Sequence, residues 1–517
     1  MKIKYIIKGI AVLSLAIAVS GCEKNFLEIN DNPNTPTTTT PELVLPAALA
    51  ATGGVVNNSF NILGNLLAGN WAQSPDFAFY QPQETYAFTS GTYNTVWTNI
   101  YADALNDFRY VETQSAASGK VNAQAIARIM QAYNFQILVD TWGDVPYTEA
   151  LKGTDLLTAK YDKAEDIYDG ILSTIDASIA IINTTATGDN PSTTSDIVFG
   201  NGTVTTAPAV AMNKWIRFAN TLKLRVLLRQ SLIPSRAAKV TAGFATLAGK
   251  TFLAAGENVG VNPGYLNQAG KYSPLYGAIG FQVNGSETSN YQATRGNKYA
   301  VDFLLANADP RVELLYRPAV SPVVAGTTYV GVYPGTTATT TARKDNFSPV
   351  GPGVLPASTN NGFAKPAYLM TAAEGFFLQA EAILKGYLPG GAAAAQTAYQ
   401  TGIQESFKLL GSTAAAATTY YTTSTQPLVS WAAATAAGRQ FEAIIVQKWV
   451  SNNGFNGLEA WTEYRRTGFP ANLPIGINNA SGGKLPLRIP YPQNELANNG
   501  ANVPVIDIFT NKIFWEK

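Results

Sequence analysis

The side chains best suited to binding chemistry in this chain are aromatic, and they gather in two stretches rich in Gly, Pro, Asn and Gln. The flat faces of aromatic rings cover the C–H patches of sugar rings, while polar neighbours bond the hydroxyl groups. These stretches therefore predict an oligosaccharide-binding surface, and the alternative that the same rings pack the loops or an interface stays open. The candidates are Trp71, Phe77, Tyr80 and Tyr86 in residues 71–93, and Tyr272, Tyr276 and Tyr291 in residues 265–291.

Each aromatic stretch also contains side chains that could bond sugar hydroxyls. They are Gln73, Asp76, Gln81 and Gln83 in the first stretch, and Gln282, Asn284 and Asn290 in the second, with Arg295 just after it. We expect the two stretches to face one cleft. Their residues are better candidates for ligand contact than residues on helical stripes, because loops carry function more often.

The composition excludes several kinds of catalysis. The 517 residues include no His and one Cys, so a Ser-His-Asp triad, a Cys-His pair and a His-ligated metal are all excluded. A formal net charge of +1, from 36 Lys+Arg and 35 Asp+Glu, argues against nucleic-acid binding, which needs a basic surface. We expect no cofactor. The 46% of residues that are apolar allow a large hydrophobic core.

One carboxylate pair keeps a hydrolase alternative open. Glu374 and Glu381 lie seven residues apart in a stretch with helical periodicity, so about 10.5 Å of helix axis separates them. That separation is just beyond the usual spacing of an inverting glycosidase pair. A helix packed among other helices is also a poor place for a sugar. Glycoside hydrolysis is therefore the less favoured alternative.

The first 22 residues form a targeting signal. Lys2, Lys4 and Lys8 precede a short apolar run, and Val19-Ser20-Gly21-Cys22 follows it, which resembles a bacterial lipobox. Acylation of Cys22 would anchor the mature chain to a membrane; the alternative is an ordinary signal peptide that contains a cysteine. No later segment has about 18 consecutive apolar residues, so no further membrane span is expected.

The remaining sequence predicts a mainly α fold of tetratricopeptide-like helical pairs, with a long loop-rich insertion and few short strands. Apolar residues recur at i, i+3 and i+4 in the helical parts, and Pro318 to Pro356 interrupt any long element in the loop-rich part. The predicted organisation is a signal peptide (1–21), a lipidated tether (22–40), an N-terminal helical region (41–253), a loop-rich ligand-binding region (254–368), a C-terminal helical region (369–470) and a docked tail (471–517).

Particular elements follow from local signals. Pro41 after Thr40 suits a helix start, and Gly143 suits the end of a helix over 122–142. Another helix is expected over 431–451. Four tryptophans on helical stripes are expected in the core: Trp97, Trp142, Trp215 and Trp449.

Two arginines near the C-terminal helices allow two interpretations. Arg465 and Arg466 could bind an anion, but Glu459 and Glu463 lie within about two helical turns of them. A structural ion-pair network is the favoured interpretation.

Several segments resemble the SusD/RagB family of nutrient-binding outer-membrane lipoproteins. CEKNFLEINDNPN (22–34) is similar to the family N-terminus, and TWGDVPYTEAL (141–151) to the segment after a long helix. MTAAEGFFLQAEAILKG (370–386) resembles a C-terminal family helix. KWVSNNGFNGLEAWTEYRRTGFP (448–470) and LPLRIPYPQNE (485–495) resemble the closing signature. The matches occur in family order.

This resemblance implies a helical scaffold with four tetratricopeptide-like pairs and an elaborated loop-rich region. It also implies a lipoprotein on the extracellular side of the outer membrane, held there by its lipid anchor alone. Such a protein is expected to cover a SusC-like TonB-dependent transporter and to pass it oligosaccharide, or in some branches peptide. Members of the family are not enzymes.

Overall fold

The computed structural model describes residues 39–517 except 183, 185–189, 201–207 and 341, and Pro41–Lys517 form one compact unit. The predicted signal peptide, Cys22 and the tether up to residue 38 lie outside the described residues. The internal domain boundaries at residues 253, 368 and 470 stay predictions.

The first described helix runs through the core. It consists of α2 (Pro41–Gly54), a π-helical segment η1 (Val55–Phe60) and α3 (Asn61–Leu67), and it begins at Pro41 as predicted. Among the described residues it is the one helix long and apolar enough to cross a membrane, with mean hydropathy 1.3. Half of that window is buried within the protein, as in a core helix, and Asn61 and Asn65 interrupt its apolar sequence with hydrogen bonds to buried partners.

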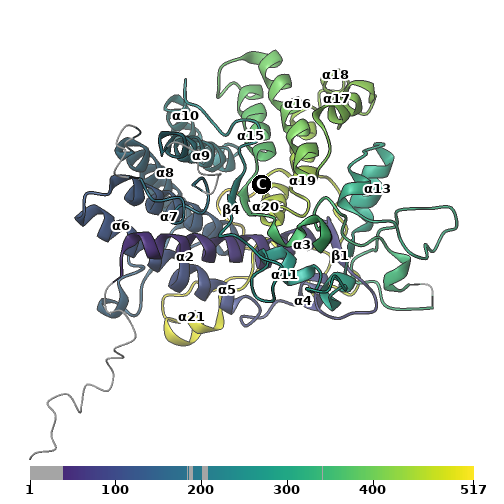
Figure 1. Cartoon of the computed structure of the whole chain (residues 1–517), viewed down its shortest axis with the longest axis horizontal. Helices are drawn as coiled ribbons and strands as arrows, with labels where there is room; N and C mark the ends of the chain where they lie inside the picture. The colour runs from purple at the N-terminus through teal and green to yellow at the C-terminus, as the bar shows by residue number, and fades with distance from the viewer. Residues whose placement is uncertain (1–38, 183, 185–189, 201–207, 341) are drawn as a thin grey trace, which may run out of the picture. The chain divides into compact units, whose positions relative to one another are not determined.

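The helices that follow pack on one another in chain order. Contacts join α6 to α7, α7 to α8, α8 to α9 and α9 to α10, while α2 packs on α6 and α7 (Figure 1). The predicted helix over 122–142 is confirmed, and Gly143 ends it with a φ of 87°. The elements are α5 (Asn94–Thr98), η2 (Asn99–Leu105), α6 (Asn106–Ala117), α7 (Val121–Trp142), α8 (Ala164–Ile181), α9 (Pro208–Gln230) and α10 (Ala237–Ala245).

A second group of helices completes the scaffold. Within it α15 packs on α16 and α19, and it also contacts α9, so it joins the two groups. The single helix predicted over 431–451 is wrong: the chain breaks between α18 and α19 at Gly438, whose φ of 64° is incompatible with a continuous right-handed helix. The elements are α15 (Ala372–Leu384), α16 (Gly391–Leu409), α17 (Ala414–Thr423), α18 (Trp431–Ala436), α19 (Gln440–Asn452) and α20 (Gly457–Thr467).

The strands are few and short in the described residues. They form three antiparallel pairs: β1 (Trp71–Gln73) with β5 (Thr294–Gly296), β2 (Val145–Pro146) with β3 (Tyr161–Asp162), and β4 (Val259–Val261) with β6 (Ala367–Met370). Between β4 and β6 lie loops and the short helices α11 (Pro274–Ile279), α12 (Ser289–Ala293), α13 (Lys298–Ala306) and α14 (Val312–Leu315). Outside these regions, α4 (Gln81–Thr85) follows β1, and α21 (Gln493–Asn498) lies in the C-terminal tail.

The core contains the tryptophans expected there. Trp97, Trp142, Trp215 and Trp449 are all buried, which confirms their assignment to the helical stripes. These four large aromatic side chains of the helical scaffold therefore contribute to core packing.

Candidate functional site

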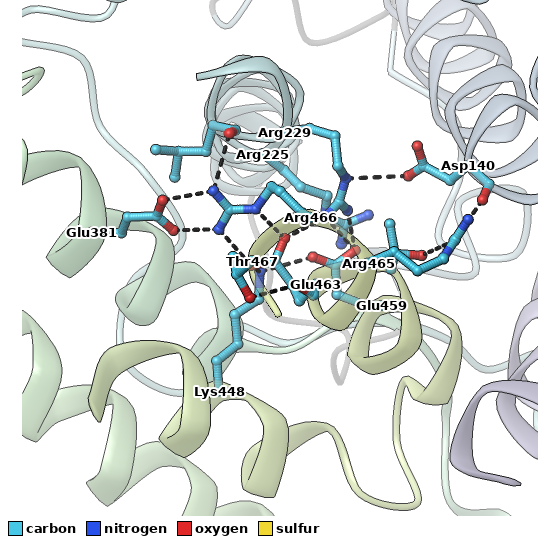
Figure 2. A network of polar contacts seen from close by, with 12 residues as sticks. Asp140, Arg225, Arg229, Glu381, Lys448, Glu459, Glu463, Arg465, Arg466 and Thr467 are labelled. Carbon is cyan, nitrogen blue, oxygen red and sulfur yellow. Dashed lines mark hydrogen bonds and ion pairs between the residues drawn. The ribbon is translucent and has the colours of Figure 1, made fainter. Parts of the chain in front are cut away.

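A buried network of charged side chains occupies the junction of α7, α9, α15, α19 and α20 (Figure 2). Arg466 lies at its centre: Nη1 donates to Glu381 Oε1 at 2.8 Å, and Nη2 donates to Glu381 Oε2 at 2.7 Å and Glu463 Oε2 at 2.6 Å. Arg229 pairs with Glu459 and Glu463. Burial alone would raise the pKa of Glu459, but Arg229 and Lys448 lower it to about 2.

This network distinguishes between the two interpretations of Arg465 and Arg466, an anion site and a structural ion-pair network. Arg466 is fully buried and bonded to two carboxylates, and Arg465 pairs with Glu516 and donates to the carbonyls of Asp140 and Leu487. Neither arginine has a free face for an external anion. The structural interpretation predicted for this cluster is therefore confirmed.

The carboxylates of the hydrolase alternative lie in the same network. Glu374 accepts a hydrogen bond from Arg225 Nε at 2.8 Å, and Glu381 is paired with Arg466. The exposed fractions of Glu374 and Glu381 are 0% and 1%. A glycosidase needs both carboxyl groups beside the scissile bond, so this pair has no access to substrate.

The two aromatic stretches meet through the β1–β5 pair. Ala72 lies opposite Arg295 and Gln73 opposite Thr294, and the Ser74 amide donates to Ala293 O at 2.7 Å. The hydroxyl oxygens of Tyr80 and Thr294 are 3.0 Å apart, within hydrogen-bonding distance. Segments about 200 residues apart in sequence therefore form one local surface.

Most of the predicted ligand-contacting aromatics are buried beneath that surface. Their burial is at odds with direct stacking on a ligand and fits the packing alternative, because a ring without exposed area offers no face to a sugar. They support the loops instead: Tyr291 Oη, for example, donates to Val350 O at 3.2 Å. The buried residues are Trp71, Tyr80, Tyr86, Tyr276 and Tyr291.

The exposed aromatic surface lies on the loop between β1 and α4. Phe77 is half-buried, while Phe79, an aromatic of the same loop that was not among the seven candidates, is 50% exposed; their ring centroids are 5.5 Å apart. Asp76 and Gln81 are exposed on either side of the pair. Tyr272 is half-buried and packs on Tyr276 at 5.4 Å. Composition identified this loop, but it did not separate exposed rings from buried ones.

Two buried polar side chains fix the conformation of this loop. Gln73 Nε2 donates to Phe77 O at 2.7 Å, and its Oε1 accepts the Tyr80 amide at 2.5 Å. Glu84 accepts the Gln73 amide at 2.8 Å and, with its other oxygen, the Gly335 amide at 2.6 Å. Phe77 and Phe79 are thus held in place before any ligand arrives.

The loop should respond to pH through Glu84. Burial raises the pKa of Glu84 from 4.5 to about 7, against two backbone hydrogen bonds that lower it. A raised folded-state pKa means that the contribution of Glu84 to stability is complete below pH 4.5 and is lost as pH rises through 7. Relative to Glu84→Gln, the wild-type unfolding free energy should fall by at most about 3 kcal/mol over this window.

Urea unfolding of the wild type and Glu84→Gln at several pH values measures this difference. The titration of all other groups affects both proteins equally and therefore cancels. A wild-type advantage that grows between pH 4.5 and 7 would contradict the assignment, because it would show that the carboxylate is favoured over the acid.

Comparison with known proteins decides the family. The SusD-like family profile described as "Starch-binding associating with outer membrane" matches residues 33–492. The chain belongs to this SusD-like family. The predicted family and the mainly α fold class are therefore confirmed. A comparison with curated proteins finds no match.

Solved structures share the fold of this SusD-like protein. One described as a chitin-binding protein superposes with a TM-score of 0.73 at 23% identity, covering 92% of this chain and 100% of that one. A chitin-binding SusD homolog from Flavobacterium johnsoniae gives 0.71 at 22% identity, covering 91% and 98%. A SusD homolog from Bacteroides uniformis gives 0.73 at 23% identity, covering 92% and 99%. At these identities the likeness establishes the fold.

Proposed function

We propose that this SusD-like protein binds oligosaccharide at the outer membrane and does not cleave it. The observation that supports this function most directly is the Phe77–Phe79 pair, presented on a loop that Gln73 and Glu84 fix in place. The family description names starch, and two of the structural relatives are described as chitin-binding. A neutral glycan of one of these classes is therefore the proposed ligand.

The chemistry of the loop suits such a ligand. Phe79 exposes an apolar ring, Phe77 supports it, and Asp76 and Gln81 supply hydrogen-bonding groups at its edges. Stacking on an aromatic face contributes on the order of 1 kcal/mol beyond the area that is buried. The carboxylate pair that hydrolysis would need is enclosed in the ion network, so binding without cleavage is the favoured outcome.

Truncation of the exposed ring should weaken binding without unfolding the protein. Phe79→Ala is expected to reduce oligosaccharide affinity by about five- to tenfold, because the stacking face is lost. The melting temperature should stay nearly unchanged, because half of the ring already lies in water. Calorimetric titration of the variant against a bound glycan measures the change.

Leu157→Ala is the matched control, since Leu157 is an exposed apolar side chain (79%) outside the site. Equal affinity of the wild type and Phe79→Ala would remove this loop from the ligand site.

We further propose that the ligand passes to a SusC-like TonB-dependent transporter and that the protein is anchored through Cys22. The support is the family's description as associating with the outer membrane, together with the sequence Val19-Ser20-Gly21-Cys22. Cys22→Ala should move most of the protein from the outer-membrane fraction to the soluble fraction, because the acyl chains are lost. Fractionation should be done in cells that lack the transporter, so that docking does not retain the variant. Undiminished membrane partitioning there would contradict lipid anchoring.

A further inference from the structure

A small cavity lies beneath the loop-rich region, between η1, α11 and the chain that leads into β6. Its volume is about 270 Å³, including the space at its mouth. Because typical ligand pockets measure about 300–1,000 Å³, this space suits a small guest and is too small for an oligosaccharide. Its walls include Asn57, Ser273, Tyr276 and Lys365, and no Asp or Glu is among the lining residues.

Lys365 brings a positive charge to this cavity without a counter-charge. Its ammonium group donates to Gly353 O and lies 4.9 Å from the ring centroid of Phe455. Within the described residues no carboxylate comes within 4.0 Å of Nζ. Burial lowers the pKa of Lys365 to about 8, and no neighbouring charge offsets that effect. An uncompensated cation in a low-dielectric site attracts an anion more strongly than one in water.

Tyr276 and Asn57 bring two further polar side chains to the cavity. The Tyr276 hydroxyl is fully buried and, apart from Ser358 beside it, has no hydrogen-bond partner among the described residues. Asn57 Oδ1 accepts the Leu275 amide at 3.4 Å. A buried donor without an acceptor is destabilising, and a bound anion would relieve that cost.

We propose that this cavity binds one small monovalent anion of the halide class, held by Lys365 Nζ and the Tyr276 hydroxyl. The anion would neutralise Lys365 and accept from donors that the protein leaves unused. It would thereby fasten α11 and the loop that holds Gly353 to the chain before β6. The site is independent of the oligosaccharide proposal, because it is too small for a glycan and uses residues outside the Phe77–Phe79 loop.

Bromide is the probe that tests this site. Crystals of the full mature chain soaked in sodium bromide should show an anomalous peak in the cavity of the wild type, and Lys365→Met should lose it. Bromide sites on the protein surface serve as the positive control for the soak. A wild-type cavity without anomalous signal, while surface sites are occupied, overturns the proposal. So does a cavity peak of equal height in Lys365→Met.

Melting in solution provides a second measurement. At equal ionic strength, replacing gluconate by chloride should raise the wild-type melting temperature by about 1–3 °C in a saturable manner. Lys365→Met should lose this shift, and Lys484→Met, which removes an exposed lysine elsewhere, should retain it. A chloride shift that is absent from the wild type, or equal in all three proteins, counts against the site.

Discussion

Arg466→Ala is expected to lower the unfolding free energy by about 3–5 kcal/mol, because it leaves the Glu381 carboxylate buried without its cation and removes one of the cations that pair with Glu463. Arg466 has an exposed fraction of 0% and donates four hydrogen bonds to those two carboxylates. Removal of one partner from a buried pair is costly even where the pair itself contributes little net stability. Equilibrium unfolding in urea measures the difference.

Arg439→Ala is the matched control for this variant. Arg439 also pairs with a glutamate, Glu442, but the arginine side chain is 42% exposed, so the loss should stay below about 1 kcal/mol. Similar losses for the two variants would show that the buried network has no special role in stability. If Arg466→Ala does not fold, Arg466→Lys, which keeps the charge, should recover a folded protein of intermediate stability.

Trp215→Ala should destabilise the fold by about 3–5 kcal/mol as a large core truncation. The indole is fully buried, lies 5.2 Å from Phe199 and 5.9 Å from Phe218 between ring centroids, and donates from Nε1 to Asp196 Oδ2 at 2.8 Å. The truncation thus opens a cavity and removes a donor from a buried carboxylate. Urea unfolding, with glycan affinity measured in parallel, tests both consequences.

Trp215→Phe separates the two consequences, since it keeps most of the volume and loses only the hydrogen bond. We expect it to cost about 1–3 kcal/mol. Glycan affinity of the folded fraction should be unchanged in both variants, because Trp215 lies in the scaffold. A loss of affinity with full stability would place Trp215 in the binding site and contradict the assignment.

A helix of the scaffold was predictable from the sequence where the spacing of its apolar residues alone defined it. The helix over 122–142 and its end at Gly143 follow from apolar spacing and a C-terminal glycine. The break between α18 and α19 was missed because Gly438, which has a positive φ, stands in an otherwise helical alanine-rich sequence. The acidic and basic residues of α20 indicated an ion network, yet its partners Arg229 and Glu381 belong to distant segments that spacing cannot connect.

The site was predictable only at the level of segments. Aromatic composition identified the loop that carries Phe77 and the segment that pairs with it through β5. Loops have no repeat that assigns a side chain to one face, so Trp71 and Phe79 could not be distinguished, although one is buried and the other half exposed. Glu84 was missed for the same reason: its role depends on amides 11 and 251 residues away.

Titration calorimetry of the mature chain with chitin oligosaccharides, starch oligosaccharides and peptides of similar length tests the central proposal most directly. Saturable binding of one glycan class is predicted, with the ligand recovered intact and no new reducing ends after long incubation. Binding of peptides alone, or the release of reducing ends, would contradict a non-hydrolytic oligosaccharide-binding protein.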